Sequence, residues 1–391
     1  MMNLRMTANH MIACCLLAGW LVVAPAHAAP IVPTSDAEII EVLPAMAGSR
    51  AEERRLRKQL ALTPRDPALA LAAAQRYLDQ AHELGDPRFA GMAMSAIGAW
   101  TDEATMPDDV LMMRATLQQY LHAFDASVTS LQRLLARPGP TRPQAWLTLA
   151  TVRRVQGRYA DSDAACQQVA RAGSALHGNA CLAENAALRG DVDRGRAALN
   201  GLLAGARHPP ATQAWMMTSL AELEQRAGNT AAAETAYRAA LKADADAYTT
   251  LAYADFLIEQ QRPAQALALL KEQPRSDAVL LRLAIAGTQA NAASAAADAA
   301  EMRERIALAN ERPDAKVFHG REQAMFALVV DRDATRALEL ARGNVAQQRE
   351  PLDLLVLAQA ARASGQAAAV EEAKRLTREI GLVDQRIKAL L

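Results

Sequence analysis

Four Asp-x-Asp pairs are the residues whose type and spacing come closest to a chemical motif. They are Asp161/Asp163, Asp191/Asp193, Asp244/Asp246 and Asp331/Asp333. Such pairs hold metal–nucleotide complexes in some glycosyltransferases. In this chain they fall near turns between predicted helices, where aspartate caps helix N-termini by accepting backbone N–H bonds. We therefore predict capping roles for them and no metal site.

The histidines lack the spacing of a zinc motif. Five follow the first 28 residues: His82, His122, His177, His208 and His319. None has another histidine at i+3 or i+4, the spacing that places two imidazoles on one helical face. The chain also lacks a glycine-rich phosphate loop and a Gly-x-Ser-x-Gly elbow. The sequence therefore predicts a non-enzymatic protein without a cofactor.

Charge and length narrow the function classes further. The 43 basic and 43 acidic residues cancel, so the chain has none of the basic excess that nucleic acid or an anionic membrane attracts. Its 391 residues exceed what one hydrophobic core usually organises. Aromatic residues make up only 4%, while alanine is abundant, and small residues allow helices to pack closely. This composition favours an array of stacked helical hairpins.

The first 28 residues have the pattern of a secretory signal peptide. Arg5 is followed by an apolar run from Met11 to Ala24, and Ala26-His27-Ala28 places small residues at the cleavage positions. The alternative is a retained anchor, but about 14 apolar residues are short for a bilayer span. We therefore expect cleavage near Ala28, a periplasmic or secreted protein, and no stable membrane insertion.

Residues 144–173 show the organisation of the rest of the chain most clearly. Trp146, Leu149 and Ala150 share one face of a first helix, and Gly157 marks a tight turn before a second helix. Similar turns recur about 34 residues apart, at Gly85, His122, Gly157, Gly190, Gly228, Gln261, Asn291, Arg332 and Gly365.

Small residues keep a fixed register to these turns. Seven residues before the turn, seven of nine positions are alanine: Ala115, Ala150, Ala183, Ala221, Ala254, Ala284 and Ala358. Five residues after it, eight of nine are small: Ala90, Ser127, Ser162, Gly195, Ala233, Ala266, Ala296 and Ala337. The repeats that turn at Asn291 and Arg332 depart most from this pattern, so boundaries within residues 287–335 are the least certain.

This pattern resembles the tetratricopeptide repeat (TPR), whose motif positions are matched by Trp146, Leu149, Ala150, Gly157, Tyr159 and Cys166. The resemblance covers roughly residues 67–380. It implies an all-α, right-handed superhelical solenoid of about nine antiparallel helical hairpins. We expect a signal peptide at 1–28, a linker at 29–50, a capping helix at 51–66, the repeats at 67–381 and a C-terminal cap at 382–391.

Two cysteines remain after the signal peptide, Cys166 and Cys181. The repeat register places them on two helical surfaces that pack together. An oxidising compartment and an even count favour a disulfide. Two buried free thiols acting as small apolar residues are the alternative.

The resemblance also implies a partner site. In TPR arrays the first helices line a concave groove, and the groove positions include Trp215, Glu222, Tyr248, Asp255 and Phe326. Aromatic residues beside carboxylates suit a peptide or a partner helix. The alternative is that Trp215 and Tyr248 pack between neighbouring helices.

We therefore expect an exported scaffold that binds a protein or peptide partner, and secreted bacterial TPR proteins often assist envelope assembly. Two alternatives remain at this point. One is a glycan-active or other enzyme, which would require Glu184, Glu222 and Asp255 to face one cavity. The other is a structural subunit of a larger envelope assembly. Fold alone does not choose among them.

Overall fold

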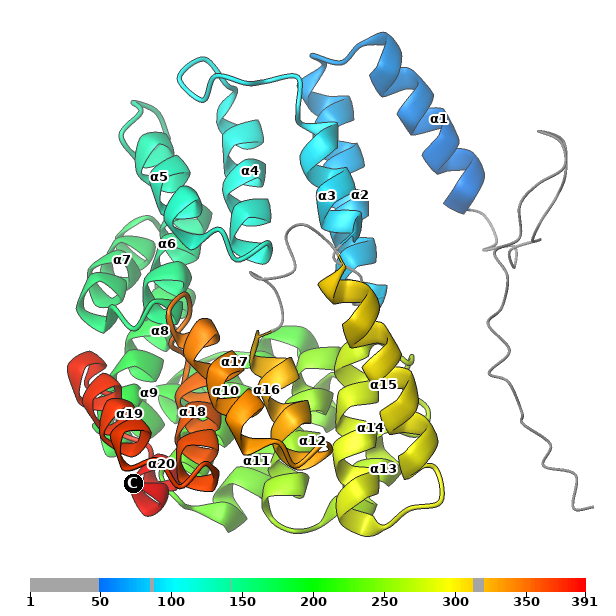
Figure 1. Cartoon of the computed structure of the whole chain (residues 1–391). Coiled ribbons are helices and arrows are strands. Elements are labelled where there is room, and N and C mark those ends of the chain that lie inside the picture. The colour runs from blue at the N-terminus through cyan, green and yellow to red at the C-terminus, as the bar shows by residue number, and fades with distance from the viewer. Residues whose placement is uncertain (1–48, 85–87, 141, 312–319) are drawn as a thin grey trace, which may run out of the picture. The chain divides into compact units, whose positions relative to one another are not determined.

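The computed structural model describes residues 49–84, 88–140, 142–311 and 320–391 (Figure 1). The chain divides into two units, residues 1–50 and 51–391, and the second contains the helices discussed below. The predicted signal peptide and nearly all of the predicted linker lie outside the described residues. Within those residues, no helix combines the length and apolar character needed to cross a membrane.

The described residues form helices and no strands. After α1 (Ser49–Leu62), nine hairpins follow, and we number them one to nine. Their first helices are α2 (Pro67–Leu84), α4 (Asp108–Tyr120), α6 (Pro143–Val155), α8 (Ala175–Leu188), α10 (Pro210–Arg226), α12 (Ala247–Glu259), α14 (Asp277–Ala290), α16 (Gly320–Val329) and α18 (Pro351–Ala363).

Their second helices are α3 (Arg88–Ala96), α5 (Phe124–Leu135), α7 (Tyr159–Arg171), α9 (Val192–Gly205), α11 (Thr230–Ala243), α13 (Pro263–Leu270), α15 (Ala295–Asn310), α17 (Ala334–Val345) and α19 (Ala367–Ile380). The short α20 (Gln385–Leu390) ends the chain. Each first helix contacts its own second helix and the first helix of the next hairpin. The predicted all-α solenoid of antiparallel helical hairpins is confirmed.

Local sequence explains where the helices begin and turn. Five helices start at a proline, whose fixed φ suits the first helical position and whose missing N–H is not needed there. The turn residue adopts a left-handed φ in eight of the nine predicted turns: His122, Gly157, Gly190, Gly228, Gln261, Asn291, Arg332 and Gly365. The ninth, Gly85, lies outside the described residues.

The small residues allow the two helices of a hairpin to approach closely. Ser127 Oγ donates to Ala115 O and Ser162 Oγ donates to Ala150 O, both at 2.8 Å. A Cβ atom on Gly195 would lie 2.8 Å from Ala183 O. Each pair joins a predicted small position before the turn to one after it. The small positions are therefore contact points between the two helices.

Hairpin seven departs from the predicted register. The prediction puts Ala296 at a buried small position, but Ala296 is exposed and Ala299 is buried instead. The reason is the connection, because α15 begins at Ala295, four residues after the turn residue Asn291. In hairpins three and eight the second helix begins two residues after the turn residue. The buried small residue of hairpin seven is therefore Ala299, three residues later than the repeat register places the small position.

The apolar core consists of successive clusters between neighbouring hairpins. Leu56 and Leu60 of α1 pack against the first cluster, and Leu382 and Ile387 belong to the cluster of hairpins eight and nine. That last cluster also contains Tyr159 and Leu188, which belong to hairpins three and four. The C-terminal end of the array therefore packs against its middle, and Figure 1 shows the red C-terminal helices beside α8.

Candidate interaction groove

Tyr248 and Glu222 form the most accessible part of the predicted partner site. The Tyr248 hydroxyl donates a hydrogen bond of 2.6 Å to Glu222 Oε1, joining α12 to α10. Although bonded, Tyr248 is 64% exposed, whereas most large apolar and aromatic side chains of the described residues are covered. The pair therefore offers an aromatic face beside a carboxylate.

The electrostatic surroundings of Glu222 favour an incoming cation. Burial raises the pKa of Glu222, and the charges of Glu184 and Glu350 raise it further. Arg226, whose Nη1 lies 3.8 Å from Glu222 Oε2, lowers the pKa only in part. The charge of Glu222 in turn holds the pKa of Tyr248 well above its ordinary value, so the hydroxyl keeps its proton.

A second polar group lies on the neighbouring first helices. Glu184 of α8 forms an ion pair with Arg154 of α6, and it accepts a hydrogen bond of 2.5 Å from Ser219 of α10. Because the charges of Glu184 and Glu350 both act on Glu222, these carboxylates share one electrostatic environment. We call Arg154, Glu184, Glu222, Arg226 and Tyr248 the inner-face cluster.

The other three predicted groove residues are engaged in packing or pairing. Trp215 is half-buried and stacks on His177 of α8, with 5.5 Å between ring centroids. Asp255 pairs with Arg282 of α14 at 2.5 Å. Phe326 is 2% exposed and lies in an apolar cluster with Leu281 and Ile285. The structure places Phe326 in the core, where a partner has no access to it.

Sequence reasoning missed the basic members of the inner-face cluster and the approach of Glu350. Arg226 lies one residue beyond the last groove position of α10, and Arg154 occupies the equivalent last groove position of α6 but was not among the groove residues singled out. Glu350 precedes α18, about 130 residues beyond Glu222 in the chain. No local pattern connects them. The signal that was present is the recurrence of a carboxylate six residues before the turn, at Glu184, Glu222 and Asp255.

The Asp-x-Asp pairs are only partly explained by capping. Asp246 accepts from Thr249 N and Asp333 accepts from Arg336 N, both as helix N-caps. Asp163 instead lies within α7 and bonds Asn185 of α8 and Arg189, which directly follows α8. For that residue the capping prediction is wrong, because the first turn of α7 lies earlier. Among the described residues, no three side chains of the His, Cys, Asp and Glu types gather as a metal site would require.

Cys166 of α7 and Cys181 of α8 are placed as a disulfide, with their Cα atoms 5.8 Å apart. This separation lies within the range that disulfides adopt. Asn185 and Ser162 surround Cys166 with weak polar contacts at 3.7 and 3.9 Å. The geometry is compatible with the bond, and its oxidation in the protein stays a prediction.

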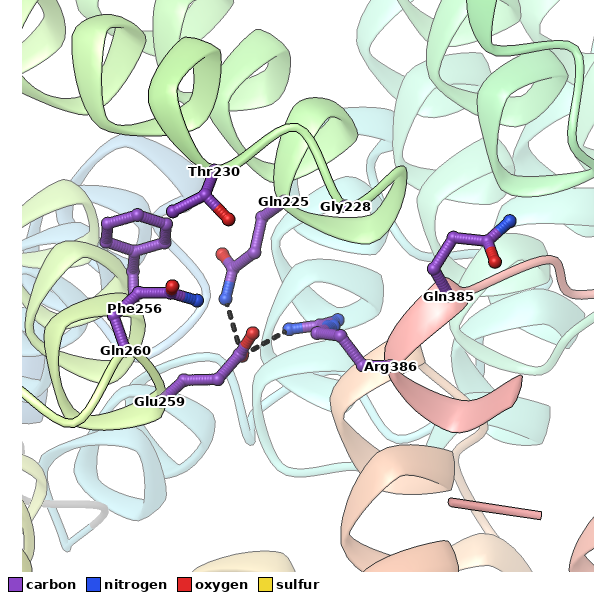
Figure 2. Close-up of a pocket in the computed structure, with 8 residues that line it drawn as sticks. All are labelled: Gln225, Gly228, Thr230, Phe256, Glu259, Gln260, Gln385 and Arg386. Carbon is purple, nitrogen blue, oxygen red and sulfur yellow. Dashed lines mark hydrogen bonds and ion pairs between the residues drawn. The ribbon is translucent and has the colours of Figure 1, made fainter. Parts of the chain in front are cut away.

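A cavity of about 210 Å³ lies between α10, α12 and α20. Its walls include Gln225, Thr230, Glu259, Gln385 and Arg386. Figure 2 shows Gln225 and Arg386 both pointing toward Glu259, and both hydrogen bonds end on Glu259 Oε2. The acids that an enzyme would need, Glu184, Glu222 and Asp255, are absent from this wall. Each is bonded to another residue of the chain.

Comparisons with known proteins bear on the fold. No protein-family model matches the chain, and no curated protein matches it. It is similar to the structure of a tetratricopeptide repeat protein from Parabacteroides merdae ATCC 43184, with 13% identity, a TM-score of 0.39, and coverage of 69% of this chain and 98% of that one.

Two further solved structures are similar. One is a Rap protein complexed with competence and sporulation factor, with 12% identity, a TM-score of 0.49, and coverage of 87% of this chain and 93% of that one. The other is the TPR domain of P58(IPK), with 13% identity, a TM-score of 0.21, and coverage of 78% and 98%. At such identities these structures give no information on partner or site.

Proposed function

We propose that this chain is a non-enzymatic scaffold that binds a protein or peptide partner at the inner-face cluster. The observation that carries the proposal is the exposed Tyr248 ring bonded to Glu222 on neighbouring first helices. A large aromatic surface is a common anchor for a partner. A carboxylate with other carboxylates around it gains most from a cation, so the expected partner presents lysine or arginine beside an apolar residue.

We further propose export, with cleavage near Ala28 and a role in the bacterial envelope. The leader pattern and the cysteine pair support this proposal, although neither identifies the pathway. Mass spectrometry of the protein recovered from fractionated cells tests it. A mature N-terminus at Ala29 in the envelope fraction supports export, and an intact N-terminus in the cytoplasmic fraction contradicts it.

The partner site is tested by a crosslinking pulldown of the tagged protein from its own organism. Wild type is compared with Tyr248→Ala, which removes the ring, and with Glu222→Gln, which removes the charge. Leu308→Ala is the matched control, because Leu308 is also exposed, at 59%, but lies on α15. We expect a discrete partner that Tyr248→Ala loses and Leu308→Ala keeps. A partner that all variants keep places the site elsewhere.

A further inference from the structure

Residues 380–386, which we call the C-terminal segment, run along the turns of hairpins three to six. Ile380 lies at Gly157 and Val383 at Gly190, where added Cβ atoms would lie 2.8 and 3.0 Å from these side chains. Gln385 lies near Gly228, and Arg386 Nη1 pairs with Glu259 Oε2 of α12 at 3.0 Å. The order of contacts along the segment follows the order of the hairpins.

Two backbone hydrogen bonds fasten this contact. Val383 N donates to Leu188 O at 2.8 Å, and Arg349 N, just before α18, donates to Val155 O at 2.6 Å. Val155 and Leu188 are the last residues of α6 and α8, where helix carbonyls have no partner within their own helix. The C-terminal end of the chain therefore caps the ends of two first helices from hairpins three and four.

The contact also contains a buried hydroxyl group without a hydrogen-bond partner in the described part of the chain, that of Tyr159. Tyr159 is 3% exposed and lies in the same apolar cluster as hairpins eight and nine. Its hydroxyl has no hydrogen-bond partner among the described residues, and a buried unsatisfied hydroxyl costs about 1–3 kcal/mol. Val383 remains 42% exposed. The apolar part of the attachment therefore contains an unsatisfied group, whereas its polar part is bonded through Arg386, which pairs with Glu259 and with the buried Asp384.

The attached loop also reaches the inner-face cluster. Arg349 N bonds the carbonyl oxygen of Val155, the residue that follows Arg154 of the cluster, and the charge of Glu350 acts on Arg154, Glu222 and Tyr248. A large partner that approaches Tyr248 must therefore share this space with the loop before α18. Small molecules are not hindered in the same way, because the Tyr248 ring is exposed to water.

We propose that the C-terminal segment, together with the loop that carries Arg349, is a releasable clasp that limits access of large partners to the inner-face cluster. In the closed form it caps Val155 O and Leu188 O, and the loop brings Glu350, which pairs with Arg321 of α16, near the cluster. Its release leaves the hairpins folded and opens the space around Tyr248. The access step rests on the proposed function, whereas the opening of the clasp can be measured without any partner.

Hydrogen exchange of the whole protein tests the opening. The Val383 and Arg349 amides are expected to be protected, yet to exchange at least about tenfold faster than amides in the middle of α8, because they open without global unfolding. Exchange as slow as that of α8 would mean that the contact opens only on unfolding. Exchange at the unprotected rate would mean that the contact does not form. Either result overturns the proposal.

Three variants separate the clasp from general stability. Val383→Asp brings a carboxylate to the C-terminal end of α8, where the helix dipole disfavours negative charge, so exchange at Arg349 should accelerate about tenfold or more. Tyr159→Phe removes only the unsatisfied hydroxyl and should slow that exchange. Leu308→Asp, a control at a more exposed apolar residue of α15, should leave it unchanged. Equal effects of Val383→Asp and Leu308→Asp would overturn the proposal.

Access is measured at a cysteine placed at Tyr248, with Cys14 and Cys15 replaced by serine. A small maleimide should label Tyr248→Cys equally with and without Val383→Asp. A maleimide on a long polyethylene glycol chain should label it several-fold faster when Val383→Asp is present. If Val383→Asp leaves the ratio of the two labelling rates unchanged, the clasp does not limit access to residue 248. A missing partner in the pulldown would leave this ratio unaffected, so the two proposals fail separately.

Discussion

Two sets of turns in this chain adopt the same left-handed conformation with different residues. Gly157, Gly190 and Gly228 have φ of 73°, 94° and 82°, while His122, Gln261, Asn291 and Arg332 reach 51–57° with full side chains. The two sets differ in what lies against them. Ile380 and Val383 press on Gly157 and Gly190, and Gln385 lies near Gly228.

The difference shows that conformation alone does not require glycine at these turns. Four turns tolerate a side chain at a cost of about 1–2 kcal/mol each. At Gly157 space adds a second demand, because a Cβ would lie 2.8 Å from Ile380. At Gly190 Val383 would have to shift slightly, and at Gly228 a Cβ would only reach ordinary contact with Gln385. Gly365 is the exception, since no atom lies within 4 Å of an added Cβ there. Gly365 therefore serves as the internal control, because a substitution there tests the left-handed conformation without the effect of space.

The largest expected effect comes from Gly157→Val. It combines the left-handed cost of about 1–2 kcal/mol with overpacking of about 1–3 kcal/mol against Ile380. Gly365→Val carries only the first cost. We expect a loss of about 4 kcal/mol in the free energy of unfolding for the former and about 1–2 for the latter, measured by urea unfolding. Equal losses would show that proximity to the clasp is irrelevant.

Loss of the cysteine pair comes next. If Cys166 and Cys181 are bonded, the sequence separation of 15 predicts a stabilisation of about 3 kcal/mol in the chain-entropy model. Reduction should then lower the unfolding midpoint and loosen hairpins three and four, on which the clasp rests. Thiol titration under denaturing, non-reducing conditions is the control. Two reactive thiols in the chain after the leader would end the disulfide prediction.

At the turns that carry a full side chain, the informative substitution is the reverse one, to glycine. Gln261→Gly removes a left-handed side chain but increases the freedom of the unfolded chain. The net expectation is a gain of about 0.5 kcal/mol, seen as a small rise in the midpoint of thermal unfolding. A clear loss of stability would indicate that the Gln261 side chain makes a contribution that its exposed position does not suggest.

The smallest effect concerns the charge at Glu222. Its folded pKa is raised above the ordinary value of 4.5, so this group stabilises the fold at low pH. That contribution is lost as pH rises through the folded pKa. Glu222→Gln keeps an acceptor for Tyr248 and should flatten this slope. At neutral pH it should be neutral or more stable by a few tenths of a kcal/mol. A steeper slope in the variant would contradict the sign.

The hairpins were predictable because each is specified locally. Ala150 and Ser162 recur at fixed distances from Gly157, and the contact between them is the same in the structure. The register shifts at Ala296 because two additional residues lie between the turn residue and the start of α15, and a turn of different length has no sequence signal. Local rules therefore describe each hairpin well and the connections less well.

The groove was predicted only in part, for a different reason. Tyr248 and Glu222 follow from their positions in neighbouring first helices, whereas Phe326 belongs to the core because α14 and α16 pack tightly there. The proximity of Glu350 to Glu222 depends on the small rotation between successive hairpins, added over several of them. No residue pattern in 380–386 indicates that this segment meets Gly190.

The bond from Arg386 to Glu259 spans 127 residues, and the contact of Ile380 with Gly157 spans more. A repeat array otherwise folds through contacts between neighbours and can begin anywhere along its length. These long-range contacts raise the contact order and require a large loop to close. During synthesis, the end of α6 must wait for Arg349 and the end of α8 must wait for Val383, within the last dozen residues, before each is capped. A chain truncated late should therefore leave the ribosome with most hairpins formed and the end of α8 open.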